Sequence, residues 1–209
     1  MNLKPSPFAP ERFPDLPVVS GVRAATGSRG FYAGRGLERD DVFLFAFEPG
    51  TTCAGVFTRS STASADVAWC RHALKKGGGY ASALVVNSGN SNAFTGPKGK
   101  LKNDATLAAM MASLGVAQTS CFLGATGGIG EPLEDPNFVG SIVPDLTQNL
   151  SSPDWAACAK AFMTTDTYPK GAGLVREIGG EQATFSGIAI GSGMIAPNMA
   201  TMLAYVFTD

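Results

Sequence analysis

The apolar residues of this chain fall into short uninterrupted runs that predict β-strands. A run at 42–47 is followed by Glu48-Pro49-Gly50 and a second run at 53–57, an order typical of two strands joined as a hairpin. Four further runs predict strands at 81–86, 121–123, 184–190 and 202–209. We expect the last run to be a buried strand, which either closes a sheet or belongs to a protein of which this chain is only part.

Helical spacing is clearest in the middle of the chain. Apolar residues recur there at intervals of three and four: Leu107, Met110, Met111 and Leu114. Asn103 or Asp104 is a suitable N-cap for this helix, and Gly115 is placed to end it.

Two further helices are expected towards the C-terminal side. One lies between residues 137 and 150, with Pro144 as a weak point early in it. Another begins at 152–154, where Ser152 suits the N-cap and Pro153 the first helical position, and continues towards Met163.

The order of these elements indicates the fold class. The first thirty residues are rich in Pro, Gly and Arg and predict an irregular arm, while 75–79 predicts a surface loop and 87–92 a polar turn. Strands and helices are mixed without strict alternation, which favours an α+β fold over a doubly wound sheet. The sequence shows no repeat and no domain boundary within these elements.

Composition narrows the classes of partner. The chain has 209 residues, of which 44% are hydrophobic and 16% charged, so it can bury one substantial core. Its 16 Lys and Arg residues nearly balance its 17 Asp and Glu residues, which leaves no broad basic face for nucleic acid. We therefore expect small molecules or protein as partners, and no nucleic acid.

The cysteines and the single histidine argue against metal and disulfide sites. Cys53, Cys70, Cys121 and Cys158 are widely separated, and His72 stands alone, so neither a zinc site nor a disulfide framework is expected. The first residues lack the apolar core of a signal peptide, and no apolar stretch reaches the roughly 18 residues of a membrane span. These observations predict buried free thiols, a cytoplasmic location and no membrane partner.

A glycine-rich turn from Gly124 to Gly130 follows a predicted strand. It lacks the Gly-Lys-Ser/Thr ending of a P-loop and the acidic partner of a dinucleotide-binding fingerprint, so phosphate binding is not favoured. Consecutive backbone N–H groups and the Thr126 hydroxyl can instead converge on a developing oxyanion. The alternative is that these glycines only turn the chain.

A polar cluster at 163–167 follows the third predicted helix. Its three threonine hydroxyls and one carboxylate suit substrate binding, and they suit a frayed helix end equally well. Lys170, a few residues further on, is either an anion partner or an ordinary surface lysine.

The segment 191–203 contains the most informative threonine. Two glycines, a proline and small residues precede Thr201, which then begins an apolar run, so its hydroxyl lies at a junction between turn and strand. A chain break before Thr201 would give it a free α-amine, with an unperturbed pKa of about 7.7–8.0, that can take the proton from its own hydroxyl. The alternative is a threonine that simply starts a buried strand.

These motifs occur together in one known family. The resemblance is carried by the segments 30–34, 54–58, 87–96, 125–130, 163–167 and 191–203. In composition and order they closely resemble the bifunctional ornithine acetyltransferases, also called glutamate N-acetyltransferases. The resemblance covers nearly the whole chain.

The resemblance implies a self-processing acyltransferase. Family members cut themselves at an Ala-Thr bond, here Ala200-Thr201, and the exposed threonine carries the acetyl group from N2-acetylornithine to glutamate; some members also use acetyl-CoA. The implied fold is a four-layer αββα sandwich, shared with self-cleaving aminopeptidases. The implied reaction needs no metal and no bound cofactor.

Particular residues take roles through the same resemblance. It implies that Thr126 and Gly127 form the oxyanion hole and that Thr164 contacts substrate, with Thr165 as the alternative one position away. The family typically has a substrate-binding lysine where this chain has Ile190, which cannot make a charge-assisted contact with a carboxylate.

The family is also built from two chains. Residues 1–200 correspond to its α-chain, and 201–209 to the start of a β-chain whose remainder is absent, so we expect a partner β-chain and a hetero-oligomer of α and β chains. Two other functions remain open: a self-cleaving amidase or aminopeptidase-like acyl hydrolase, and a catalytically incomplete binding remnant.

Overall fold

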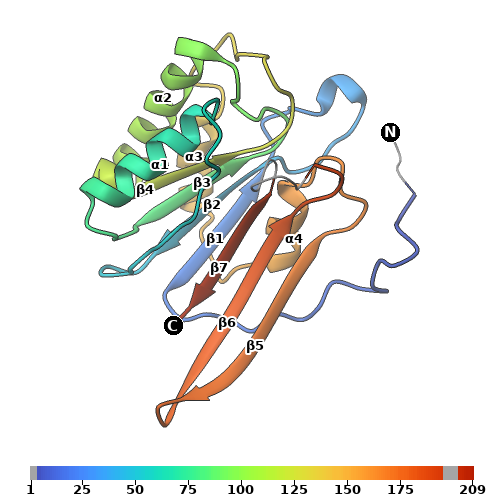
Figure 1. The fold of residues 1–209 in the computed structure, drawn as a ribbon, viewed down its shortest axis with the longest axis vertical. Helices are drawn as coiled ribbons and strands as arrows, with labels where there is room; N and C mark the ends of the chain where they lie inside the picture. Colours follow the sequence, from blue (N-terminus) through green and yellow to red (C-terminus); the bar gives the residue numbers. More distant parts are fainter. Residues whose placement is uncertain (1–3, 195–201) are drawn as a thin grey trace.

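The structure is a computed structural model that describes residues 4–194 and 202–209. It contains two β-sheets (Figure 1). The first has the order β1-β2-β3-β4, formed by Val22–Gly27, Val42–Phe47, Ala83–Asn87 and Cys121–Ala125. The second has the order β5-β6-β7, formed by Lys170–Ile178, Glu181–Ile190 and Leu203–Thr208. All neighbouring strands are antiparallel except β3 and β4, which are parallel.

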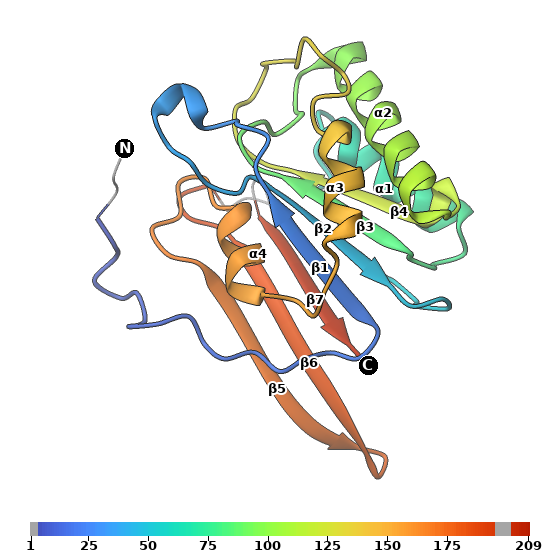
Figure 2. The ribbon, with the colours of Figure 1, turned by 180° about the vertical axis from the view of Figure 1, so that it is seen from behind.

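Helices α1 (Ala65–Lys76), α2 (Gly96–Leu114) and α3 (Val143–Gln148) cover one face of the first sheet, and α4 (Trp155–Ala161) packs into the core on its other face. Helices α1, α2 and α3 lie on the outer side of the sheet, and α4 lies beside β1 and β6 (Figures 1 and 2). Short 3₁₀ turns form at Ala33–Arg35, Gln118–Ser120 and Gly140–Ile142. Two stacked sheets with an outer helical layer account for three layers of an αββα arrangement, and the fold is α+β as expected.

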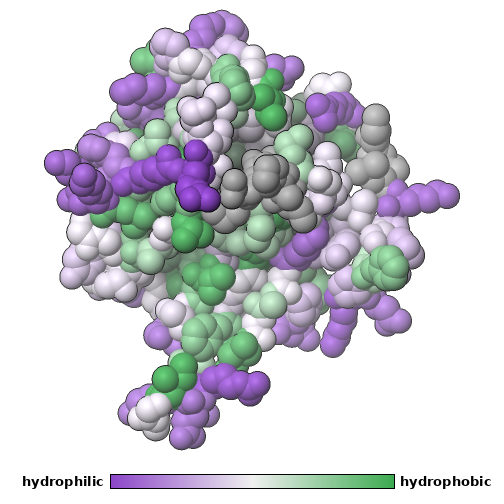
Figure 3. All heavy atoms as spheres, viewed as in Figure 1, coloured by the Kyte–Doolittle hydropathy of each residue, from purple (hydrophilic) through white to green (hydrophobic). Residues whose placement is uncertain are grey.

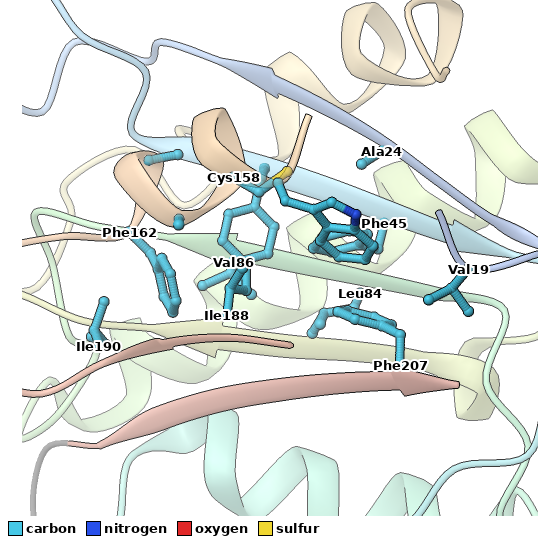
Figure 4. Close-up of a cluster of buried hydrophobic side chains, with 14 residues drawn as sticks. Val19, Ala24, Phe45, Leu84, Val86, Cys158, Phe162, Ile188, Ile190 and Phe207 are labelled. Atoms are coloured by element: carbon cyan, nitrogen blue, oxygen red, sulfur yellow. The ribbon is translucent and has the colours of Figure 1, made fainter. Parts of the chain in front are cut away.

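The central strand β2 explains why its apolar run does not alternate. Phe43 and Phe45 point between the sheets, where they meet Ile188 and Phe207 of the second sheet (Figure 4). The intervening residues of β2 point the other way and pack under α2 and α3. A strand buried on both faces needs apolar residues at every position.

The second sheet is buried on one face only. Strand β7, predicted to be fully buried, alternates instead: Phe207 is buried whereas Val206 is 73% exposed. Apolar side chains are visible at the surface over this sheet (Figure 3). The exposed large hydrophobic residues on its strands are Leu174, Val175, Ile178 and Val206.

Two strand predictions were wrong. The first thirty residues are not wholly irregular, because β1 pairs along its whole length with β2. The run at 53–57 forms no strand: it contains the exposed Val56, and the chain there is joined to its surroundings by a single bridge from Thr52 to Tyr80. Strand β2 therefore has β1 and β3 as neighbours, and the predicted hairpin does not exist.

Three helix starts also differ from the prediction. Helix α2 begins at Gly96, with Pro97 in its first turn, so Asn103 is a buried residue within the helix and not its cap. Helix α4 is capped by Asp154, whose carboxylate accepts a hydrogen bond from Ala157 N (2.9 Å), and not by Ser152. The expected helix at 137–150 is shorter and begins as a 3₁₀ turn, which places Pro144 harmlessly in the first turn of α3.

Two elements were missed. Helix α1 has a Ser64 cap and basic residues in its last turn, so the predicted loop at 75–79 begins as the end of a helix. Strand β5 contains Gly171 and Gly173 because Phe13 and Pro17 of the N-terminal arm pack against them. No helix in the part of the chain that the structure describes is long and apolar enough to span a membrane.

Candidate active site

Two loops at the carboxyl ends of β3 and β4 form the centre of the candidate site. We call residues 87–93 the asparagine loop and residues 125–131 the glycine loop. The loops lie side by side because β3 and β4 are parallel neighbours. Backbone hydrogen bonds join them in both directions: Thr126 N to Asn87 O (3.0 Å), Gly128 N to Gly89 O (3.1 Å) and Gly130 N to Ala93 O (2.8 Å) from the glycine loop, and Ser91 N to Gly128 O (3.0 Å) from the asparagine loop.

Thr126 is the most unusual residue of the glycine loop. It is 1% exposed, and its hydroxyl oxygen has no hydrogen-bond partner among the described residues. An unsatisfied buried hydroxyl costs about 1–3 kcal/mol of stability. A hydroxyl kept at that cost is available as a donor to a ligand.

Gly127 is glycine for a steric reason. Its φ of 131° is unfavourable for other residues, and a methyl group built on it would overlap the Gly89 carbonyl. Gly89 is constrained in turn, with a φ of 94° and Phe31 so close that an added methyl carbon would lie 2.5 Å from the Phe31 Cβ. The backbone of the glycine loop is therefore held tightly against the asparagine loop.

The segment after α4 reaches the same region. The Ser88 hydroxyl donates a hydrogen bond to Ala161 O (2.7 Å), and the Arg39 guanidinium donates to Met163 O (3.1 Å). The Ser88 bond holds the end of α4 against the asparagine loop, and the Arg39 bond ties the segment after α4 to the chain before β2. Thr164 follows directly and is half-buried, while Thr165 is exposed.

Asp166 ties this segment to the end of β6. It is 7% exposed, and its Oδ1 accepts hydrogen bonds from Lys170 Nζ (2.5 Å) and Gly191 N (3.1 Å). Asp166 of the 163–167 cluster therefore makes a buried polar contact, whereas Thr165 of the same cluster is exposed. Lys170 is an ion-pair partner of Asp166 and not an ordinary surface lysine.

Thr164 and Ile190, the two predicted substrate-binding residues, line the same small cavity. Its volume is about 20 Å³, enough for roughly one water molecule. The cavity is lined by Thr164, Thr165, Asp166, Ile190, Gly191, Ser192 and Met194. Ile190 is 3% exposed and belongs to the apolar core between the sheets (Figure 4), so it offers this cavity no charge.

The predicted cleavage site, Ala200-Thr201, lies outside the described residues. Its flanking strands are described: Ile190 and Leu203 are paired across β6 and β7. The inner face of β7 passes β4, because a methyl group on Gly124 would overlap the Tyr205 hydroxyl. The beginning of β7 therefore lies at the same end of the molecule as the carboxyl ends of β3 and β4 (Figures 1 and 2).

Several buried polar residues of this region were not singled out from the sequence. Asn90 and Asn92 are 4% and 2% exposed. The density of Asn and Ser in the asparagine loop was visible, but it predicted only a polar turn. Burial, which marks these side chains as structural or functional anchors, is a tertiary property.

A larger cavity lies on the other side of the asparagine loop. Its volume is about 330 Å³, and none of the predicted site residues lines it. The lining residues are Thr62, Ala63, Ser64, Ala65, Asn92, Phe94, Thr95 and Gly96.

Comparison with known proteins agrees with the motifs. The sequence pattern of the ArgJ family matches residues 25–209. The chain belongs to the ArgJ family. Proteins called arginine biosynthesis bifunctional protein ArgJ are similar along the whole chain: that of Bradyrhizobium diazoefficiens is 47% identical and that of Agrobacterium fabrum 46% identical, over 209 residues. This ArgJ-family chain covers 49% of each, so it spans about half the length of these relatives.

Solved ArgJ structures share the fold. The arginine biosynthesis bifunctional protein ArgJ of Bacillus halodurans superposes with a TM-score of 0.76 at 26% identity, covering 87% of this chain and 92% of that one. An ornithine acetyltransferase of Mycobacterium tuberculosis, solved in complex with ornithine, gives 0.73 at 29% identity, covering 88% and 94%. The two-sheet architecture is therefore that of ArgJ proteins.

Proposed function

We propose that this chain is the N-terminal part of an acyltransferase that transfers an acetyl group from N2-acetylornithine to glutamate. Membership of the ArgJ family and the names of its relatives support a role in arginine biosynthesis. The observation that carries the proposal is the buried Thr126 hydroxyl, which has no partner among the described residues, beside the constrained Gly127. A hydroxyl donor held in this way suits an oxyanion that forms only during reaction.

The nucleophile in this proposal is Thr201, produced by self-cleavage. Its Oγ1 attacks the Ala200 carbonyl carbon, the peptide nitrogen leaves as an amine, and water hydrolyses the resulting ester. The products are a chain ending at Ala200 and a chain beginning with a free Thr201 amine. That amine, with an ordinary pKa of about 7.7–8.0, is then the base nearest to the Thr201 hydroxyl.

Acetyl transfer follows in two similar steps. The Thr201 amine takes the hydroxyl proton as Oγ1 attacks the acetyl carbonyl of N2-acetylornithine, and the tetrahedral oxyanion accepts hydrogen bonds from Thr126 and Gly127. The C–N bond then breaks, ornithine leaves with the proton, and acetyl-Thr201 remains. The glutamate amine attacks this ester through the same oxyanion geometry, which restores Thr201 and releases N-acetylglutamate. Acetyl-CoA can replace N2-acetylornithine as donor, and no metal or organic cofactor takes part.

Substrate recognition in this proposal is shared between two halves. Thr164 contributes from the small cavity, where Ile190 makes the wall apolar. Because the chain spans about half the length of its relatives, we expect the other contacts to come from a β-chain that begins at Thr201 and forms a hetero-oligomer with residues 1–200.

The test uses the native assembly, expressed from its complete coding region and purified through an N-terminal tag. Incubation with N2-acetylornithine and glutamate should produce N-acetylglutamate and ornithine, and intact mass should show a species ending at Ala200. The matched control is Thr201→Ala, which should neither cleave nor transfer. Release of acetate without N-acetylglutamate, or full transfer by Thr201→Ala, would refute the proposal.

A further inference from the structure

A buried ion pair joins the two long helices outside the first sheet. Lys102 Nζ of α2 lies 3.2 Å from Asp66 Oδ1 of α1, and the two side chains are only 4% and 3% exposed. Removing two charges from water usually costs about as much free energy as their attraction returns, so such a pair is weak evidence for added stability. The pair lies next to the asparagine loop, and its contact with that loop indicates a role other than added stability.

The second oxygen of Asp66 binds the asparagine loop. Asn92 Nδ2 lies 2.7 Å from Asp66 Oδ2, 3.0 Å from Asn103 Oδ1 and 3.1 Å from Gly99 O. Asn92 Oδ1 accepts a hydrogen bond from the Thr95 hydroxyl (2.8 Å). The backbone of Asn92 is left-handed, with a φ of 54°, so a non-glycine residue is held there in an uncommon conformation. One amide therefore connects the loop to both helices.

Hydrogen bonds from the asparagine loop in turn hold the glycine loop in place. Asn92 N donates to Asn90 Oδ1 (3.0 Å), and Asn90 Nδ2 donates to Glu131 O (2.6 Å). Ser91 binds Gly128 O twice, through its backbone N–H (3.0 Å) and its hydroxyl (2.7 Å). The bonds of the Asn90 amide and the Ser91 hydroxyl supplement the backbone bonds between the loops, so a shift of the glycine loop would disturb the contacts on both sides of Asn92.

We propose that Asp66, Lys102 and Asn92 are positioning residues for the oxyanion-binding glycine loop. The ion pair fixes the Asp66 carboxylate, the carboxylate fixes the Asn92 amide, and the asparagine loop then fixes Thr126 and Gly127. None of the three positioning residues touches the small cavity or needs to touch substrate. The inference rests on the proposed function, because it assigns these residues to the oxyanion hole of that reaction.

The experiment compares Asn92→Gly with Thr126→Val in the native assembly. Glycine accepts the left-handed backbone and removes only the amide. We expect kcat to fall about tenfold with KM for N2-acetylornithine little changed, and we expect the fall to be less than about threefold in the Thr126→Val background, because residues that act through one another are not additive. Lys100→Met, which breaks the exposed Lys100–Asp104 pair on the same helix, is the control and should leave kcat unchanged.

A second variant addresses the ion pair itself. Asp66→Leu combined with Lys102→Met replaces the pair by apolar side chains, removes the nearest of the three acceptors of Asn92 Nδ2 and is expected to fold. It should reproduce the kcat loss of Asn92→Gly. Equal losses of kcat by Asn92→Gly in both backgrounds, or full kcat in this double variant, would overturn the inference.

One measurement separates the inference from the proposed reaction. Hydrogen–deuterium exchange of the peptide at 125–131 should become faster in Asn92→Gly and stay unchanged in Lys100→Met. If the unaltered assembly transfers no acetyl group, the proposed function fails, and the exchange result alone decides the inference. Unchanged exchange at 125–131 in Asn92→Gly would then overturn it.

Discussion

At the scale of single residues, Thr126 combines a structural cost with a proposed catalytic gain. Replacing it by valine removes a buried hydroxyl that has no partner among the described residues. We expect the free energy of unfolding of Thr126→Val to stay constant or rise by up to about 1 kcal/mol. Because the oxyanion loses one donor, kcat for acetyl transfer should fall about 10²–10³-fold. Urea unfolding and steady-state kinetics on the same preparation check both values.

Thr106→Val is the matched control. Thr106 is also fully buried, but its hydroxyl donates a hydrogen bond to Lys102 O (2.8 Å) within α2. Its replacement should lower the free energy of unfolding by about 1 kcal/mol and leave kcat unchanged. If Thr126→Val instead lowered the free energy of unfolding and left kcat unchanged, as expected for Thr106→Val, the Thr126 hydroxyl would have a structural partner and no catalytic role.

The sequence predicted only part of this site. The glycine-rich turn drew attention to Thr126, the resemblance to a family motif added Gly127, and their role in an oxyanion hole stays a prediction. That the Thr126 hydroxyl has no partner among the described residues was not predictable, since it depends on what the fold places around it. Lys170 was undecided for the same reason: its partner Asp166 is only four residues away, yet the burial of that carboxylate comes from the packing of α4 against β6.

At the scale of secondary-structure elements, the two faces of β7 should contribute very differently to the free energy of unfolding. Phe207 lies with its ring centroid 4.6 Å from that of Phe45 and 5.2 Å from that of Trp155, whereas Val206 points outward. Phe207→Ala should lower the free energy of unfolding by about 3–5 kcal/mol, because it leaves a cavity between the sheets. Val206→Ala, one residue away, should change it by no more than about 0.5 kcal/mol. Similar losses for the two variants, measured by urea unfolding, would contradict this placement of the core.

Elements were predictable where one local signal determined them. Strand β2 is apolar at every position because both of its faces are buried, and Gly115, with a φ of 68°, ends α2 where expected. Strand β1 escaped prediction because its small and polar residues pair with β2 without a distinctive pattern. The run at 53–57 was misleading for the converse reason, since its apolar residues include exposed ones. Pairing partners decide such segments, and these lie far away in sequence.

At the scale of the whole molecule, three buried thiols lie in or beside the two apolar cores. Cys158 lies in the core between the sheets, Cys121 in the core under the helices, and Cys70 between α1 and β4. All four cysteines are free, as expected, although Cys53 is only half-buried. Burial raises the pKa of each of the three buried thiols from 9.0 to about 12.

These pKa shifts make the free energy of unfolding depend on pH in the alkaline range. Between pH 9 and 12 the unfolded chain releases thiol protons that the folded chain retains, so the free energy of unfolding falls as pH rises. The contribution is fully present below pH 9, and each thiol removes about 1.4 kcal/mol per pH unit above it.

Under reducing conditions, urea unfolding from pH 8 to 10.5 should therefore show a less steep decline for Cys158→Ala than for the unaltered chain. The cavity left by alanine adds a loss that is the same at every pH, so only the difference in slope is diagnostic. Parallel curves would mean that Cys158 ionises as readily in the folded protein as in the unfolded one, and that the core between the sheets admits water.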